Sequence, residues 1–146
     1  MVKVLIKKLD SKVQLPKYKT DGSSGMDLMA FLESPVNLKP QESELIPTGI
    51  SIAIPEDTEI QIRPRSGLAA KSNISVLNTP GTIDADYRGE LKVILINLSD
   101  KVFVVEKGLR IAQMVLCPVV KATLKEVTEL ENTERGSGGF GSTGTK

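Results

Sequence analysis

The polar residues that could do chemistry gather in a few short segments between apolar runs. In the segment NTPGTIDADYRGELKV, the turn residues Asn78, Pro80 and Gly81 lead to Asp84 and Tyr87. An amide can pair with the edge of a base, a carboxylate can hold a water molecule, and an aromatic ring can cover a sugar. An ordinary polar turn would account for the same residues. The segment predicts a β-hairpin and leaves its chemical role open.

A second polar segment, IRPRSGLAAK, places a basic residue, a serine and a glycine at the start of a short helical pattern. Ser66 and the backbone N–H groups that follow it can cap this helix or hold a phosphate. Arg65 adds a guanidinium suited to a bidentate phosphate contact. Simple helix capping explains the segment equally well, so both interpretations stand.

The C-terminal segment RGSGGFGSTGTK combines glycine, serine and threonine with a single aromatic residue. This composition cannot build a core and is typical of a flexible tail without function. Phe140 favours a second interpretation, a mobile lid whose apolar ring covers a ligand. Gly136, Gly138 and Gly141 fit the spacing GxGxxG, but too little chain follows for the helix that a dinucleotide site requires. We therefore exclude a dinucleotide site in this segment.

The composition excludes several classes of site and partner. The chain has no histidine, which excludes Ser-His-Asp triads, Cys-His pairs and histidine-ligated zinc and leaves base chemistry to carboxylates. Cys117 is the single cysteine, and its apolar surroundings predict a buried packing residue. A formal charge of +1 gives no general electrostatic attraction to nucleic acid or to an anionic membrane. No apolar run approaches the ~20 residues of a membrane span, so we expect a cytoplasmic protein.

The elements that must position these segments are predicted to be strands. Alternating apolar residues or dense β-branched runs predict strands at residues 2–6, 50–54, 60–62, 92–98, 102–105 and 110–120. We expect the last three to be buried on both faces. The best short helix begins at Ser66. Many short strands with one helix predict an all-β fold, a jelly-roll-like barrel or sandwich. We expect one domain over residues 1–132, followed by a flexible glycine-rich lid over residues 133–146.

In their order along the chain, five segments resemble the motifs of the trimeric dUTPase family. These segments are SSGMDLMA (23–30), PRSGLAAK (64–71), GTIDADYRGEL (81–91), RIAQMVLCP (110–118) and RGSGGFGSTG (135–144). The resemblance implies jelly-roll-like subunits that assemble as a homotrimer, with three active sites that each draw on all three chains. It implies hydrolysis of dUTP to dUMP and pyrophosphate, which supplies dUMP and limits the incorporation of uracil into DNA.

The resemblance also implies roles for the residues that contact the nucleoside. Asp84 would hold and activate the water that attacks the α-phosphorus, and a carboxylate is an ionised acceptor at neutral pH. Asn78 and the backbone near Thr82 and Ile83 would recognise uracil. Tyr87 would pack against deoxyribose, so that a 2′-hydroxyl collides with its ring and UTP is rejected.

For the phosphates and the metal, the resemblance implies a second group of residues. Arg65, Ser66, Gly67 and Gln113 would surround the triphosphate, and Lys92 would lie near the nucleotide. In the tail, Phe140 would stack over uracil, while Arg135, Ser142 and Thr143 would reach the phosphates. The implied cofactor is Mg²⁺, with Asp27 contacting a magnesium-bound water, and the phosphates would supply ligands that a protein cage would otherwise provide.

Two other functions are compatible with parts of this pattern. The related dCTP deaminases share the fold, but they carry a glutamate in a TLE segment where this chain reads Glu90, Leu91 and Lys92 after Gly89. A nucleotide-binding trimer without turnover is the other alternative. A pure binder has no need for a water-holding carboxylate at position 84, which favours the enzyme.

Overall fold

The described residues form ten strands and one short helix. The computed structural model describes residues 2–139 of the 146-residue chain. The elements within that range are β1 Leu5–Lys8, β2 Met26–Met29, β3 Val36–Leu38, β4 Ser43–Ala53, β5 Thr58–Arg63, α1 Ser66–Ser72, β6 Ile74–Val76, β7 Gly81–Ile83, β8 Glu90–Asn97, β9 Phe103–Val105 and β10 Arg110–Pro118.

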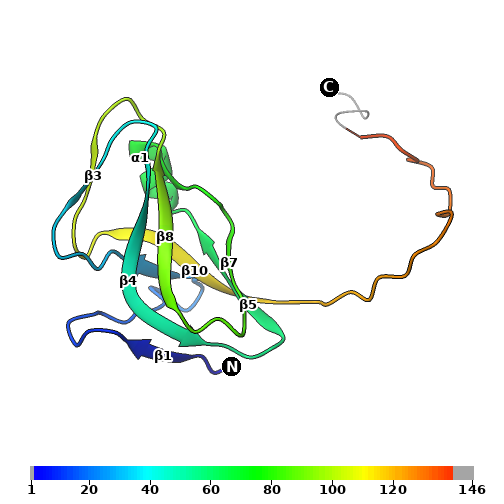
Figure 1. The fold of residues 1–146 in the computed structure, drawn as a ribbon, viewed down its shortest axis with the longest axis horizontal. Coiled ribbons are helices and arrows are strands. Elements are labelled where there is room, and N and C mark those ends of the chain that lie inside the picture. The colour runs from blue at the N-terminus through cyan, green and yellow to red at the C-terminus, as the bar shows by residue number, and fades with distance from the viewer. Residues whose placement is uncertain (1, 140–146) are drawn as a thin grey trace.

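Two four-stranded antiparallel sheets form the body of the domain (Figure 1). One sheet has the strand order β1-β4-β8-β6 and the other has the order β2-β10-β5-β7, while β3 and β9 form a separate pair. The single helix α1 begins at Ser66, as the sequence predicts. The all-β, jelly-roll-like fold with one short helix is confirmed.

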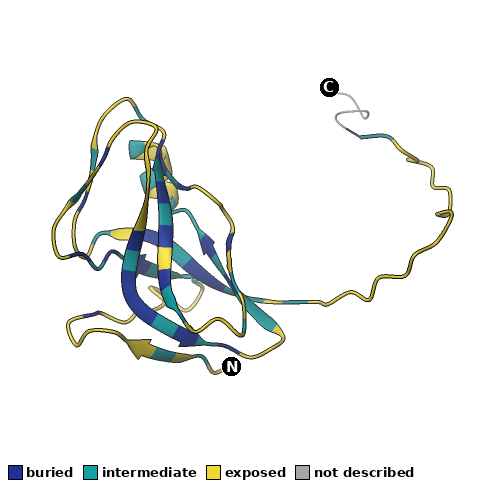
Figure 2. Ribbon diagram, viewed as in Figure 1, coloured by how far each residue is buried: buried dark blue, intermediate teal, exposed yellow. Residues whose placement is uncertain are grey.

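The core takes its side chains from both large sheets. Ile50 and Leu91 from the first sheet and Ile60 and Ile62 from the second belong to one cluster of buried residues, visible as dark bands along the strands (Figure 2). Burying a side chain of this size contributes roughly 1.5–3 kcal/mol. The period-two placement of isoleucine therefore determines which face of each sheet points inward.

The prediction that the dense β-branched runs are buried on both faces is wrong for β8 and for β9, in which Val104 is exposed. Leu91, Val93 and Leu95 are buried, whereas Lys92 between them is exposed and Ile94 is only partly covered. A sheet in a two-layer fold has only one face against the core. Strand β10 does have consecutive buried residues, Ile111 with Ala112 and Met114 with Val115. The first pair lies at the shift in register with β2 between Arg110 and Ala112.

The predicted hairpin after Asn78 is also wrong. Strand β7 pairs with β5 in one sheet, whereas β8 pairs with β4 and β6 in the other. Residues 84–89 therefore carry the chain from one sheet to the other. The glycines and aspartates permit a sharp turn in either case, and the burial of the two flanking strands decides which sheet each one joins.

Cys117 differs from its predicted buried state. It is only half-buried, and its sulfur lies 3.6 Å from Nη2 of Arg63. The cysteine lies near the C-terminal end of β10, where the residues of the strand are no longer buried.

The chain after β10 leads away from the two sheets (Figure 1). In this segment Val120 is 94%, Leu124 is 93% and Leu130 is 86% exposed, so its apolar side chains find no cover within one chain. Across residues 2–139, no helix is long and apolar enough to cross a membrane.

Candidate active site

Five residues predicted to contact the nucleotide line one cavity of about 210 Å³: Asn78, Thr82, Ile83, Tyr87 and Lys92. The cavity lies where β7 of one sheet meets β8 of the other, and side chains from both sheets form its walls. An apolar wall with a few convergent polar groups is typical of a site for a small ligand.

The turn over residues 84–89 presents Tyr87 to this cavity. The backbone N–H of Tyr87 donates to the carbonyl of Asp84 at 3.1 Å, and the Tyr87 hydroxyl donates to the carbonyl of Glu90 at 3.0 Å. Arg88 closes the turn by donating from Nη1 to the carbonyl of Ala85 at 2.7 Å. The backbone N–H and the side-chain hydroxyl of Tyr87 are thus both held by carbonyl oxygens, those of Asp84 and Glu90.

Gly89 allows the tyrosine ring to approach the backbone closely. A Cβ atom added at Gly89 would lie 2.9 Å from Cε2 of Tyr87 and closer still to its hydroxyl oxygen. Real Cβ atoms do not make such contacts, so a larger residue at position 89 would displace the ring or the turn.

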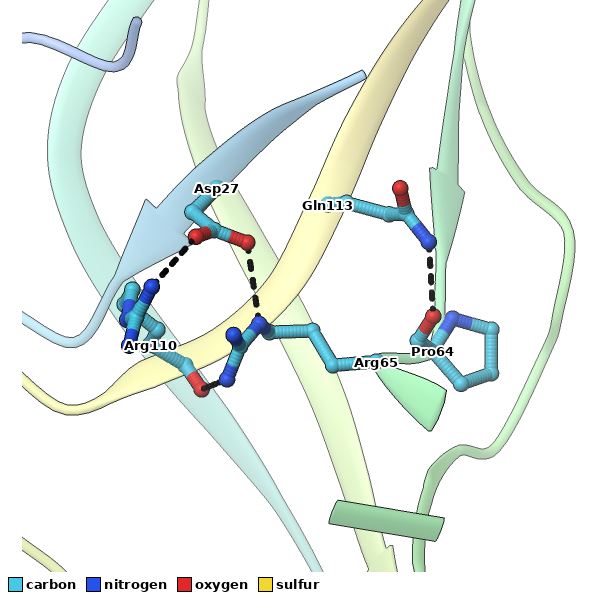
Figure 3. A network of polar contacts seen from close by, with 5 residues as sticks. All are labelled: Asp27, Pro64, Arg65, Arg110 and Gln113. Carbon is cyan, nitrogen blue, oxygen red and sulfur yellow. Dashed lines mark hydrogen bonds and ion pairs between the residues drawn. The ribbon is translucent and has the colours of Figure 1, made fainter. Parts of the chain in front are cut away.

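A second group of predicted residues lies around Asp27 on β2 (Figure 3). One carboxylate oxygen of Asp27 accepts from Nε of Arg65 at 2.9 Å, and the other accepts from Nη1 of Arg110 at 3.1 Å. The Asp27 side chain is only 18% exposed. Two cations on one partly buried carboxylate balance its charge where water cannot do so fully.

Gln113 joins this group through the strand pairing. It lies opposite Asp27 on one side and opposite Arg63 on the other, and its Nε2 donates to the carbonyl of Pro64 at 3.1 Å (Figure 3). The structure therefore brings together Asp27, Arg65 and Gln113, as the motifs imply.

The start of helix α1 differs from the capping prediction. Arg65 occupies the N-cap with an extended backbone, no side chain caps the helix, and Ser66 is the first helical residue. The capping interpretation of Ser66 is therefore wrong. The first N–H groups of any helix have no intrahelical partner, so those at Ser66 and Gly67 suit an anion.

Asp84 shares the turn of Tyr87, but it does not line the nucleoside cavity. It borders a separate, wide cavity of about 610 Å³ with Glu59, Asp86 and Arg88. Because Ile83 pairs with Ile60, Asp84 lies beside the Glu59 end of β5, whereas Arg65 lies beyond the opposite end. At roughly 3.3 Å per extended residue, the backbone from Glu59 to Arg65 spans about 20 Å.

The two other groups are also separated across the sheet. Strand β2, which carries Asp27, and strand β7, which carries Thr82, are the opposite edges of the order β2-β10-β5-β7. Three strand spacings correspond to about 14 Å. One chain therefore holds the predicted site residues in three places rather than in one pocket.

Of the four tail residues predicted to contact the nucleotide, Arg135 is among the described residues. Arg135 lies in the extended C-terminal segment, where its Nε donates to the carbonyl of Gly138 at 2.9 Å. Phe140, Ser142 and Thr143 lie outside the described residues.

Two residues with prominent contacts were missed by the sequence reasoning. Arg110 forms the second ion pair of Asp27, and its signal was a lone cation at the head of an apolar run. Glu90 accepts a hydrogen bond from the backbone N–H of Gly49 at 2.9 Å and lines the nucleoside cavity. In the sequence, Glu90 follows the turn glycine Gly89, at a place where the segment differs from the TLE segment of dCTP deaminases.

Among residues 2–139, no three His, Cys, Asp or Glu side chains converge to hold a metal ion. Asp27 offers a single carboxylate beside two guanidinium groups. This donor set suits a magnesium ion that arrives on phosphate oxygens and keeps its waters, and does not suit a cage made by the protein alone.

The chain is similar to known proteins over nearly its whole length. The dUTPase family model matches residues 11–144. A protein of Rickettsia bellii (strain OSU 85-389), named deoxyuridine 5'-triphosphate nucleotidohydrolase, is 61% identical over 99% of this chain and 97% of its own. A protein of the same name from Hydrogenobaculum sp. (strain Y04AAS1) is 58% identical over 99% of this chain and 100% of its own.

Solved structures agree with these sequence matches. A dUTPase variant of Staphylococcus bacteriophage 80alpha, solved with dUpNHpp, has a TM-score of 0.88 at 29% identity and covers 98% of this chain and 99% of its own. A dUTPase variant of phage phi11 of S. aureus, described with a structural Mg(II) ion, has the same fold, with a TM-score of 0.80 at 23% identity. This match covers 89% of the present chain and 99% of the phage chain. The chain belongs to the dUTPase family, whose members hydrolyse dUTP.

Proposed function

We propose that this dUTPase cleaves dUTP to dUMP and pyrophosphate by water attack on the α-phosphorus, with Asp84 holding and activating the water. This reaction supplies dUMP and limits the incorporation of uracil into DNA. The observation that carries the proposal is the nucleoside-sized cavity lined by Asn78, Thr82, Ile83 and Tyr87 at the turn that also bears Asp84.

Nucleoside selection follows from the shape of this cavity. Asn78 and the backbone at Thr82 and Ile83 pair with uracil, and the closed turn leaves no room for a methyl group on the base. The Tyr87 ring packs on deoxyribose and rejects a 2′-hydroxyl by collision. The fixed hydroxyl contact of Tyr87 with the Glu90 carbonyl supports this role, because a ring that excludes by contact must not move aside.

The triphosphate is held by Arg65, Ser66, Gly67 and Gln113, with Lys92 near the nucleotide. Gln113 donates a hydrogen bond to the carbonyl of Pro64, the residue before Arg65, and this contact places Gln113 near Arg65 and supports the assignment. In the tail, Arg135, Ser142 and Thr143 contact the phosphates and Phe140 stacks over uracil. We assign residues 1–132 to the β-domain and residues 133–146 to a lid that closes over bound substrate.

Asp27 is proposed to contact a water of the Mg²⁺ that accompanies the phosphates. When bound, this ion neutralises phosphate charge and aligns the leaving pyrophosphate. Because both carboxylate oxygens of Asp27 face guanidinium groups, Arg65 must turn from the carboxylate toward the phosphates when substrate binds. The removal of that cation frees the carboxylate for the metal-bound water.

The working unit is proposed to be a homotrimer with three shared active sites. The separation of Asp84 from Arg65 along β5, and of Asp27 from Thr82 across the sheet, supports sites completed by neighbouring chains. Leu45, Leu77 and Leu98 are each about half exposed in one chain, and subunit contact would cover such residues. We propose a cytoplasmic location.

A pyrophosphate-release assay with dUTP, dTTP, dCTP and UTP tests the function. We expect turnover of dUTP alone, and in ¹⁸O-labelled water the label is expected in dUMP. Label in pyrophosphate would contradict attack at the α-phosphorus. Ammonia release from dCTP would support the deaminase alternative, and dUTP binding without turnover would support a non-catalytic trimer.

A further inference from the structure

We propose that Glu90 is a positioning residue that holds the Lys92 ammonium at the wall of the nucleoside cavity and thereby strengthens dUTP binding. The inference rests on the proposed function, because it adds a residue to the same site. Glu90 and Lys92 both line the cavity that contains Asn78 and Tyr87.

The two oxygens of the Glu90 carboxylate have different partners. Oε1 accepts the backbone N–H of Gly49 at 2.9 Å, and Oε2 lies 3.7 Å from Nζ of Lys92. The Glu90 side chain is 23% exposed and that of Lys92 is 43% exposed. A lysine as exposed as this one samples many rotamers unless an anion restricts it.

The contact with Gly49 makes Glu90 a fixed anion. The pairing of β4 with β8 shifts register between Pro47 and Ser51, and Gly49 within this bulge has a φ of +71°. Its N–H is satisfied by a side chain in place of the neighbouring strand, which is how an extra residue in a bulge can be accommodated. A Cβ atom at Gly49 would lie 3.1 Å from Cδ1 of Phe31, so the side chains of the core pack closely against the bulge.

The main chain of Glu90 is fixed as well. Its carbonyl accepts the Tyr87 hydroxyl at 3.0 Å, so one residue orders the ring that covers the sugar and the cation beside it. The alternation of β8 places the side chains of residues 90 and 92 on the same side of the strand, away from the core. Lys92 is therefore held as a donor toward an oxygen of the nucleotide.

This contact does not involve the α-phosphorus, so it should act equally on the bound substrate and on the transition state. Loss of such uniform binding raises KM and leaves kcat unchanged. A merely structural role for Glu90 would instead lower thermal stability and kcat.

The substitution Glu90→Gln isolates the ion pair, because an amide oxygen can still accept the Gly49 N–H while the negative charge is removed. We expect KM for dUTP, and Kd for dUpNHpp measured by calorimetry, to rise about fivefold, with kcat within about twofold of wild type. The matched control is Glu42→Gln, which removes the exposed ion pair with Lys39 in the turn between β3 and β4; neither residue lines the cavity. It should leave KM and Kd unchanged.

A double-mutant cycle with Lys92→Met tests whether Glu90 acts through Lys92. Lys92→Met alone should raise KM as much as Glu90→Gln does, and the double variant should be no worse than either single variant. Glu90→Ala, which also loses the Gly49 contact, should lower the melting temperature further than Glu90→Gln.

Three results would overturn the inference: wild-type KM and Kd in Glu90→Gln, an undiminished effect of Glu90→Gln in the Lys92→Met background, or a loss of kcat at unchanged KM. If the wild-type enzyme did not hydrolyse dUTP, the proposed function would fail first. Failure of the inference alone would leave wild-type turnover of dUTP intact.

Discussion

At the scale of single residues, two of the predicted site side chains, Tyr87 and Gln113, are fixed by contacts with the backbone. The Tyr87 hydroxyl donates to a carbonyl, its ring abuts Gly89, and Gln113 donates to the carbonyl of Pro64. Asp27 is the exception, since its position depends on two cationic side chains. A backbone partner has no rotamers, so it suits a residue such as Tyr87 that is proposed to recognise shape. A side-chain partner can turn away, which suits the pair of Asp27 and Arg65 if the two must separate when substrate binds.

Asp84→Asn should lower kcat by about 10²- to 10⁴-fold, because an amide cannot accept a proton from the attacking water. Binding of dUpNHpp should change little, since the amide is nearly isosteric. Steady-state kinetics and calorimetry measure the two quantities. A kcat near that of wild type would remove Asp84 from its assigned role.

Gly89→Ala should push the Tyr87 ring out of place, because the new Cβ would lie within 2.9 Å of the ring. We expect kcat/KM for dUTP to fall roughly tenfold and the preference for dUTP over UTP to shrink. Gly22→Ala is the control, since a Cβ there meets nothing within 4 Å. Equal selectivity in both variants would argue against steric exclusion by Tyr87.

At the scale of elements, β8 links the nucleoside cavity to the remainder of the fold. It begins at Glu90 beside the cavity and ends at Asn97, which is 0% exposed. The Asn97 amide donates to the carbonyls of Leu38 and Lys101, at 2.8 and 2.7 Å, and its oxygen accepts from the Ser99 hydroxyl and backbone N–H. One buried side chain thus joins β8 to the end of β3 and to the loop between β8 and β9.

Asn97→Ala should reduce the free energy of unfolding by about 2–3 kcal/mol, because it removes a buried hydrogen bond to the Leu38 carbonyl and the contacts with Ser99 and Lys101. Urea unfolding at fixed protein concentration measures the change, since the stability of an oligomer depends on concentration. Lys39→Ala, which breaks an exposed pair, should cost less than about 1 kcal/mol. Similar losses in both variants would show that the Asn97 contacts add nothing.

Deletion of residues 135–146 should lower kcat/KM for dUTP while the melting temperature stays within about 2 °C of wild type. The described part of this segment lies away from the sheets, so its loss removes no core contact (Figure 1). Differential scanning calorimetry and steady-state kinetics test both parts of the prediction. Full activity after the deletion would identify the segment as a tail without function.

At the scale of the whole molecule, the separation of the predicted site residues within one chain supports the proposed shared sites. Asp84 lies beside the Glu59 end of β5, Arg65 lies beyond the opposite end, and Asp27 and Thr82 lie on opposite edges of one sheet. These residues therefore form separate groups within one subunit. A symmetric assembly repeats each group around an axis, so a group from one chain can face a different group from its neighbour.

Mixed trimers of Asp84→Asn and Arg65→Gln chains should therefore recover activity. With equal co-expression and random assembly, about one quarter of the sites would receive intact residues from both donor chains. Turnover of purified mixed trimers should approach that fraction of wild-type turnover, whereas each variant alone should be nearly inactive. Activity no greater than that of the separate variants would place both residues in the same chain's site.

Local patterns in the sequence were enough to predict the all-β class and the helix starting at Ser66. Isoleucine at period two identifies a strand, because side-chain alternation operates over a few neighbouring residues. The family resemblance also rests on such short motifs, and the family assignment it suggested is confirmed. The roles of the site residues stay predictions.

Sheet membership and the distances between site residues were decided only by the tertiary structure. The turn after Asn78 is compatible with a hairpin, yet β7 and β8 join different sheets because each must cover a different part of the core. The ion pair of Asp27 with Arg110 joins residues 83 positions apart, and no local pattern encodes such a contact. Which faces are buried is a property of the packed molecule as a whole, since every strand's cover is supplied by strands distant in sequence.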